Sequence, residues 1–320
     1  MPIIASSYGG PPKYLFNGHL ETIIPSLLRK VEGVEYTREK INTPDDDFLN
    51  LDWSKVGSKQ LLIISHGLEG DSMRHYAMGL AKLFNQNGID VLAWNNRTCG
   101  GELNLQPILY HHGASYDLDS VINHALNDGF YEEIFLTGIS MGGAQTLKYL
   151  GEKGVDLPKQ ITKAAVYSTP CNLPSSAATL KFASNSFYKK RFLGKLKEKM
   201  RLKAQQFPDL IDLVLLESVN DFDQFDTHFT AKIHGFRDAA DFYRSVSADN
   251  WMHQIQIPTL IVNAINDPLL GPECYPIKLA EQKSNLFLEM PKRGGHTGFL
   301  RKGEEFTWAE VRLLQFLTGI

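Results

Sequence analysis

The sequence predicts an α/β protein with a mostly parallel central sheet, flanked by helices and carrying one helical insertion. Short apolar runs alternate with helix-forming segments as far as residue 168. Such alternation is typical of a parallel sheet with helices on both faces. Between about residues 171 and 256 the alternation stops, and it resumes at residue 257. The third observation is a glycine-flanked serine at a strand-to-helix turn, which predicts the position of the active site.

The bulk composition restricts the class of protein. A length of 320 residues fits one α/β domain with an insertion. The net charge of -3 gives no reason to expect a nucleic-acid partner. Cys99, Cys171 and Cys274 are widely spaced, without zinc or disulfide spacing, so we expect a reducing compartment and no metal. The sequence shows neither a signal-peptide pattern nor an apolar run of about 18 residues, which predicts a cytoplasmic protein without a membrane span.

Residues 1–35 are predicted to form an arm packed on the core. A short helix is expected to begin near His19 and to end before Pro25, since the residue before a proline disfavours helix. We interpret His19 as structural.

A β-hairpin is predicted next. Its strands are expected at residues 34–37 and 48–53, joined by a turn at Asp45, Asp46 and Asp47. Three consecutive aspartates could suggest a metal loop, but solvated carboxylates at a hairpin tip are the preferred interpretation.

Residues 61–64 form an apolar run typical of a buried parallel strand. The glycine-rich loop that follows, residues 65–70, lies upstream of the serine turn, where a backbone donor for an oxyanion is expected. We assign that donor to the Leu68 N–H, and we expect His66 to order the loop.

The segment around Ser140 reads Gly138-Ile139-Ser140-Met141-Gly142, between the apolar run 134–136 and a helix-forming segment. A sharp strand-to-helix turn crowds the serine backbone, so glycine is needed two positions away on either side. The turn exposes the Ser140 hydroxyl and places the Met141 N–H at a helix N-terminus, where it can face an oxyanion. An ordinary glycine-rich turn is the alternative, which the surrounding strand–turn–helix pattern disfavours.

Other polar residues near the predicted strand ends have structural interpretations. Arg97, after the strand 89–94, is expected to hold its loop by pairing with a carboxylate. Cys99 could be a nucleophile, but the serine turn makes this the weaker hypothesis. His111 and His112 suggest a metal, yet no carboxylate or cysteine stands beside them at ligand spacing.

The insertion at residues 171–256 reads as helical and is predicted to form a cap over the strand ends. It begins with a basic stretch, residues 189–203, which could bind an anionic head group or a membrane surface. A solvated helix face is the preferred interpretation.

Two further polar residues follow predicted strands after the insertion. Asp267 comes just after the strand 257–264, and His296 lies in a glycine-rich loop after the strand 286–290. Catalytic groups in parallel sheets gather at this carboxyl edge. A final helix is expected over residues 305–317. We therefore divide the chain into the arm 1–35, a core of 36–170 and 257–320, and the cap 171–256.

Ser140, Asp267 and His296 together form the order serine, acid, histidine that α/β-hydrolases use. A serine hydroxyl needs a base, and His296 is assigned to that role. Asp267 would fix the histidine tautomer and stabilise its charged form. The N–H groups of Leu68 and Met141 would bind the oxyanion.

Several motifs of the chain together match a known family. They are Phe16-Asn17-Gly18-His19-Leu20-Glu21-Thr22, residues 66–70, residues 96–102, residues 110–113, residues 138–143, Asp267-Pro268 and residues 294–299. With these motifs the chain resembles the YheT-like branch of the α/β-hydrolase superfamily, related to mammalian abhydrolase-domain lipases. The resemblance covers nearly the whole chain, including an insert segment over residues 225–236. Thr98 departs from the family, which usually has glycine there.

The resemblance implies a serine carboxylesterase acting on short- to medium-chain acyl or lipid-like esters, without cofactor. The expected partner is a small-molecule ester, and peripheral contact of the protein with lipid is left as an open alternative. Acyl transfer to an alcohol and a non-catalytic ligand-binding protein remain alternatives. Dehalogenase and epoxide hydrolase chemistry are disfavoured because both need an aspartate at position 140.

Overall fold

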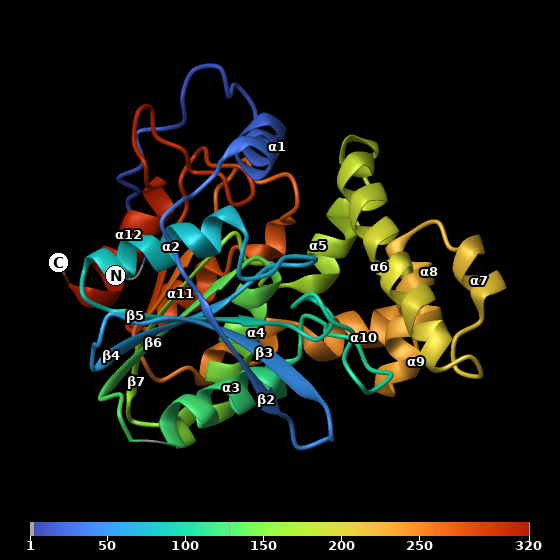
Figure 1. The fold of residues 1–320 in the computed structure, drawn as a ribbon. Coiled ribbons are helices and arrows are strands. Elements are labelled where there is room, and N and C mark those ends of the chain that lie inside the picture. The colour runs from blue at the N-terminus through green and yellow to red at the C-terminus, as the bar shows by residue number, and fades with distance from the viewer. Residues whose placement is uncertain (1–2, 128, 320) are drawn as a thin grey trace.

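A nine-stranded sheet forms the centre of the molecule in the computed structural model, which describes residues 3–127 and 129–319 (Figure 1). The strand order is β1-β9-β8-β7-β6-β4-β5-β3-β2, and only the β2–β3 and β3–β5 pairs are antiparallel. The strands are β1 Ile3–Ile4, β2 Thr37–Asn42, β3 Phe48–Ser54, β4 Gln60–Ser65, β5 Asp90–Asn95, β6 Glu133–Ile139, β7 Ile161–Tyr167, β8 Thr259–Val262 and β9 Leu286–Glu289.

Helices connect these strands and form the insertion. The α-helices are α1 Gly18–Leu28, α2 His75–Gln86, α3 Ser115–Asn127, α4 Met141–Lys153, α5 Leu173–Leu180, α6 Ser186–Gln206, α7 Leu213–Ser218, α8 Phe222–Phe225, α9 Ala231–His234, α10 Ala239–Val246, α11 Ile277–Gln282 and α12 Trp308–Thr318. Short 3-10 turns cover Gly154–Asp156, Ala183–Asn185, Ala248–Asn250, Met252–Gln254 and Pro272–Cys274, and a π-helical turn covers Asp226–Thr230. In the described part of the chain, every helix is too short or too polar to cross a bilayer.

The buried strands carry apolar side chains on both faces, which is why they read as continuous apolar runs. In β4, Leu62 and Ile64 pack with helices α2 and α12, whereas Leu61 and Ile63 pack with α3 and α4. Figure 1 shows α2 and α12 on one side of the sheet and α3 on the other. The two cores fix the sheet rigidly, so the loops at its carboxyl edge have a stable support.

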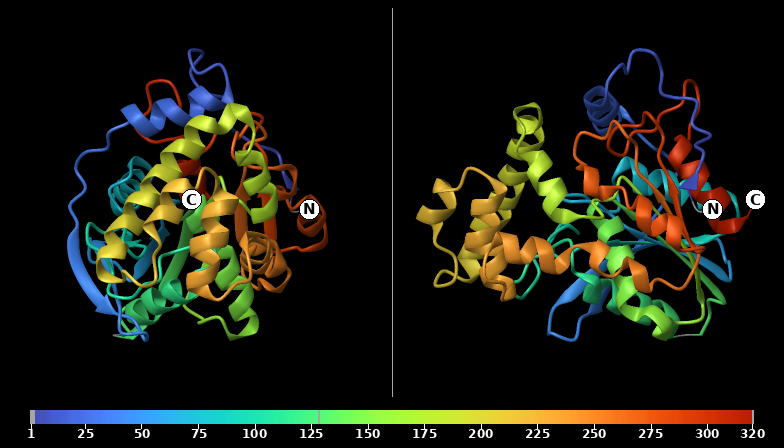
Figure 2. Two further views of the ribbon diagram at one scale, coloured as in Figure 1. Left: turned by 90° about the vertical axis from the view of Figure 1, so that its right-hand side faces the viewer. Right: turned by 180° about the vertical axis from the view of Figure 1, so that it is seen from behind.

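The insertion forms a helical cap on this frame, as the fold class predicted. The insertion consists of helices α5 to α10. Helices α6 to α9 project from one side of the core in Figure 1 and in the right-hand view of Figure 2. The cap has a small apolar core of its own, centred on the buried residues Met200, Leu216 and Phe225.

The N-terminal arm differs from expectation at two points. Helix α1 continues through Pro25 to Leu28, because a helix can pass a proline when the lost N–H bond and the local bend are tolerated. Ile3 and Ile4 form the edge strand β1, parallel to β9, a pairing too short to leave a pattern in the sequence.

The predicted hairpin exists, but its first strand lies at Thr37–Asn42 rather than at residues 34–37. The interpretation of its three aspartates as solvated is wrong for Asp47, whose carboxylate is buried. Asp47 accepts hydrogen bonds from Phe48 N–H, Leu105 N–H and the Arg97 guanidinium. It thus fixes two loops that are distant in sequence.

Candidate active site

Ser140 stands on a sharp turn between β6 and α4. Its backbone has φ 57° and ψ -121°, a strained conformation for a residue other than glycine. A Cβ atom at Gly142 would lie 2.1 Å from the Ser65 carbonyl oxygen, and one at Gly138 would lie 2.3 Å from the Gly142 oxygen. The two glycines are therefore required by close backbone contact, which is the reason the sequence pattern suggested.

The structure brings Ser140, His296 and Asp267 into one hydrogen-bonded chain. His296 Nε2 lies 2.8 Å from Ser140 Oγ, and His296 Nδ1 lies 2.8 Å from Asp267 Oδ2. The Asp267 carboxylate is fully buried and also accepts a bond from the Leu269 N–H. Because a carboxylate only accepts, it places the imidazole proton on Nδ1 and leaves Nε2 free to accept the serine proton.

The two backbone donors assigned from sequence come from two segments that adjoin the serine. Met141 is the first residue of helix α4, and Leu68 is in the loop after β4. Within the described part of the chain, neither N–H has a hydrogen-bond acceptor. A Cβ atom at Gly67 would lie 3.1 Å from Ser140 Cβ, so glycine lets the Leu68 loop approach the serine closely.

The loop that carries His296 is held by helix α1, which sequence reasoning treated only as packing. The buried Glu21 carboxylate accepts bonds from Gly294 N–H at 2.6 Å and from Arg293 Nε at 2.8 Å. It also accepts from the Asn266 amide, next to Asp267. One carboxylate of the N-terminal segment thus connects both loops that supply the acid and the base.

Thr22 and Gly18 complete this contact. Thr22 Oγ1 accepts a bond from the His296 N–H at 2.8 Å. A Cβ atom at Gly18 would lie 2.0 Å from the Asn266 carbonyl oxygen, so the helix can approach only with glycine there. The Asn17-to-Thr22 motif could be found in the sequence, but its contact with the histidine loop could not, because Thr22 and His296 are 274 residues apart. His19 contacts the Tyr188 hydroxyl of the cap at 3.2 Å.

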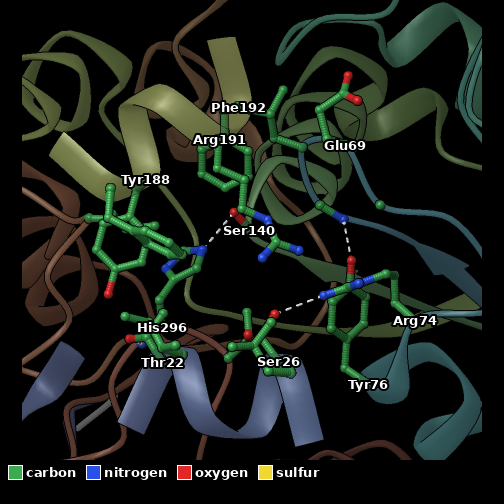
Figure 3. A pocket seen from close by; sticks show the side chains of 18 of the residues that line it. Thr22, Ser26, Glu69, Arg74, Tyr76, Ser140, Tyr188, Arg191, Phe192 and His296 are labelled. Carbon is green, nitrogen blue, oxygen red and sulfur yellow. Dashed lines mark hydrogen bonds between the residues drawn. The ribbon is translucent and has the colours of Figure 1, made fainter. Parts of the chain in front are cut away.

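Two pockets meet at the serine. One is largely apolar and is lined by cap and core residues that include Leu173, Ala177 and Phe192. The other opens between helix α1, the loop before α2 and cap helix α6, and its side chains are shown in Figure 3. Ser140 and His296 line both pockets, so the hydroxyl stands at their junction.

His66 has the structural role that was expected. Its ring is buried, with Nδ1 2.8 Å from the Gly67 carbonyl oxygen and Nε2 accepting from the Asn96 N–H at 3.0 Å. Burial lowers the pKa of His66 to about 4, so the ring is neutral and can both donate and accept. It connects the Leu68 loop to the loop after β5.

Cys99 has an environment that opposes a role as nucleophile. Burial raises the pKa of its thiol to about 11, although Lys199 Nζ lies 3.1 Å from the sulfur. The thiolate is the reactive form, and little of it exists at neutral pH. Lys199 also pairs with Glu69 at 3.0 Å and so connects the cap to the loop after β4.

Arg97 pairs with three carboxylates, those of Asp45, Asp47 and Asp117, at 2.7 to 2.9 Å. Thr98, where the resemblance departs from glycine, has φ 64°, the left-handed region that glycine favours. The loop geometry is therefore kept by a strained threonine.

His111 is buried against the rings of His234 and Phe242. Among the described residues, His, Cys, Asp and Glu side chains form no group of three suited to a metal ion.

The sheet, the serine turn and the hydrogen-bonded serine, histidine and aspartate are together the features of an α/β-hydrolase. The family model Hydrolase_4, described as serine aminopeptidase, S33, matches residues 57–282, and the chain belongs to this family within the α/β-hydrolase superfamily.

Within that superfamily the chain is a YheT-like, esterase-type member. It is 30% identical over 316 residues to "Putative esterase YheT" of Escherichia coli K12, covering 96% of this chain and 92% of that protein. It is 26% identical over 309 residues to human "Phospholipase ABHD3", covering 93% and 75%. An esterase of Pyrococcus furiosus, Pf2001, has the same fold, with a TM-score of 0.60, 17% identity and 98% of each chain covered.

Proposed function

We propose that the protein hydrolyses carboxylic esters through an acyl-enzyme on Ser140. The observation that carries the proposal is the pair of 2.8 Å contacts that His296 makes, one to Ser140 Oγ and one to Asp267. A hydroxyl in contact with an oriented imidazole is the arrangement that nucleophilic serine catalysis needs. The relatives named esterase and phospholipase support the same class of reaction.

In the first half of the reaction, Ser140 Oγ attacks the ester carbonyl carbon while His296 Nε2 takes the hydroxyl proton. The negative charge that forms on the carbonyl oxygen would be bound by the N–H groups of Leu68 and Met141. Asp267 stabilises the imidazolium, which then gives its proton to the leaving alcohol. Water repeats these steps on the acyl-enzyme and releases the carboxylic acid.

The acyl chain is assigned to the apolar pocket. Its lining includes Leu173, Ala177, Leu180, Phe192 and Leu270, contributed by cap and core alike. Leu173, Ala177 and Leu270 are buried, so a chain placed against them would leave water. Each methylene group buried there contributes about 0.8 kcal/mol, so the rate should increase with chain length until the pocket is full.

The test combines a fluorophosphonate probe with a series of p-nitrophenyl esters of increasing chain length. Wild type should be labelled and should hydrolyse the esters, whereas Ser140→Ala should do neither. Asp267→Asn should fold normally and lose about 10⁴ in kcat, as loss of the orienting carboxylate does in other serine hydrolases.

Two outcomes would contradict the proposal. Equal labelling of wild type and Ser140→Ala would place the nucleophile elsewhere. A folded wild-type protein that neither labels nor hydrolyses would favour the non-catalytic alternative. Addition of a short alcohol to the assay separates acyl transfer from hydrolysis, because transfer would yield a new ester in place of the acid.

A further inference from the structure

The second pocket at Ser140 has a cationic lining. Arg74, Arg191 and Lys195 all line it, together with one carboxylate, that of Glu69. The Glu69 side chain is 4% exposed, and its charge is already neutralised by Lys199, which lies outside this lining. The lining of this pocket therefore carries a net positive charge, which would face a bound ligand.

Neither arginine has an acidic partner among the described residues. Arg74 Nη2 donates to Ser26 Oγ, a neutral group, at 2.9 Å. Within residues 3–127 and 129–319, the Arg191 side chain has neither an ion pair nor a hydrogen bond. Both side chains are half-buried. A guanidinium group is always charged, so partial burial without a counter-ion is unfavourable unless a bound anion supplies one.

The arginines come from different parts of the chain and converge. Arg74 stands at the start of helix α2 in the core, and Arg191 is on helix α6 of the cap. Figure 3 shows both side chains directed into the pocket beside Ser140 and His296. A solvated helix face, the interpretation preferred for the basic stretch 189–203, describes the exposed Lys190 but not Arg191. It is also wrong for Lys203, which is buried and bonded to the carbonyl oxygen of Gln106 at 2.6 Å.

Ser140 thus stands between a pocket without Lys or Arg in its lining and a second pocket whose partly apolar lining carries three cations. The apolar pocket suits the acyl chain, which leaves the cationic pocket for the alcohol part of the ester. Two guanidinium groups and a lysine match an oxyanion with several acceptor oxygens and more than one negative charge. A phosphate monoester has both properties.

We propose that the substrate is an ester whose alcohol part carries an anionic group, a phosphate in the first instance, bound by Arg74 and Arg191. This rests on the proposed function of Ser140. Hydrolysis breaks the acyl C–O bond, water supplies a hydroxyl to the acyl carbon and a proton to the alcohol, and the phosphate group leaves unchanged on that alcohol.

A matched pair of soluble substrates tests this. 1-Butanoylglycerol 3-phosphate and 1-butanoylglycerol share the acyl group and differ by the phosphate, and both are short enough to stay monomeric. Wild type should favour the phosphorylated ester by about 10-fold or more in kcat/KM, since one charge-assisted hydrogen bond contributes about that factor. Most of the difference should be in KM, and it should decrease as salt is added. Glycerol 3-phosphate should inhibit competitively, and inorganic phosphate more weakly.

Arg191→Gln and Arg74→Gln should each bring the preference for the phosphorylated ester close to one, mainly by raising KM for that ester. Lys190→Gln is the control, because it removes a neighbouring cation of the same helix that does not line the pocket. It should keep the full preference. Circular dichroism and fluorophosphonate labelling establish that each variant is folded with a reactive serine.

Equal kcat/KM for the two esters, in a wild type that labels and hydrolyses, would overturn the anionic-substrate proposal and leave the esterase proposal standing. A preference that survives both arginine substitutions would overturn the assignment of the site. Loss of binding to anionic vesicles in the arginine variants, with no effect on the soluble pair, would assign the cations to a membrane surface instead. Absence of labelling in wild type would contradict the esterase proposal itself.

Discussion

Glu21→Gln tests how strongly the N-terminal helix controls the histidine loop. The substitution keeps the size of the side chain and removes its charge. The Glu21 carboxylate is 1% exposed and accepts from Arg293 Nε, Gly294 N–H and the Asn266 amide. Glutamine has one acceptor oxygen in place of two, and its NH₂ group would face another donor.

The size of the effect follows from these three donor groups, each counted as one bond, although Arg293 also donates through Nη2. A hydrogen bond to a charged group contributes about 1.5–3 kcal/mol, and one between neutral groups about 0.5–1.5 kcal/mol. The difference is about 1 kcal/mol for each bond, or about 3 kcal/mol in total. Because the Arg293 side chain is 39% exposed, solvent screens its share, and we expect a loss of about 2 kcal/mol in the free energy of unfolding.

Activity should decrease as well, since Gly294 and Asn266 adjoin the loops that hold His296 and Asp267. We expect kcat to fall by about 10-fold or more at a temperature where the variant is folded, with KM little changed. Urea unfolding followed by tryptophan fluorescence measures the first effect, and p-nitrophenyl butanoate hydrolysis the second. Glu32→Gln is the matched control at an exposed glutamate. If Glu21→Gln unfolds within about 0.5 kcal/mol of wild type and keeps its kcat, the assigned positioning role is wrong.

Three further substitutions probe the cap and the core. Burial raises the pKa of Asp226 from 3.8 to about 6, so the folded protein binds the carboxyl proton more tightly than the unfolded chain does. The stability that this proton contributes is fully present below pH 3.8 and is lost as the pH rises through 6. Between pH 4 and 7, wild type should thus lose about 2–3 kcal/mol of unfolding free energy relative to Asp226→Asn, because each unit of pKa shift corresponds to about 1.4 kcal/mol. The same pH dependence of the unfolding free energy in wild type and variant, measured by urea unfolding, would contradict this. Arg97→Met leaves two buried aspartates unpaired and should cost about 3–5 kcal/mol of unfolding free energy. Arg237→Met, at a side chain that is 78% exposed, should leave the urea midpoint at the wild-type value in the same assay. Gly194→Ala, at a position in α6 with open space around its Cβ, should raise the free energy of unfolding by up to about 1 kcal/mol, and a decrease would mean that the cap helix packs differently.

Local rules in the sequence determined the fold class and the order of its parts. Continuous apolar runs such as residues 61–64 mark buried parallel strands because both of their faces are covered. The turn at Ser140 could be recognised in the sequence because its backbone geometry permits only glycine at positions 138 and 142. The positions of Asp267 and His296 were predictable as well, since both follow strands and the carboxyl ends of parallel strands lie at one edge.

Only the tertiary structure decided the contacts between segments that are distant in the chain. The roles of Glu21 and Thr22 depend on a loop more than 270 residues away. Asp47 was read as solvated because its buried partner Arg97 is 50 residues further along. Arg191 belongs to a run of similar cations, and nothing local distinguishes it from Lys190. A sequence pattern records the periodicity of one element, whereas a pocket forms where separate elements meet, so its charge becomes visible only once the chain is folded.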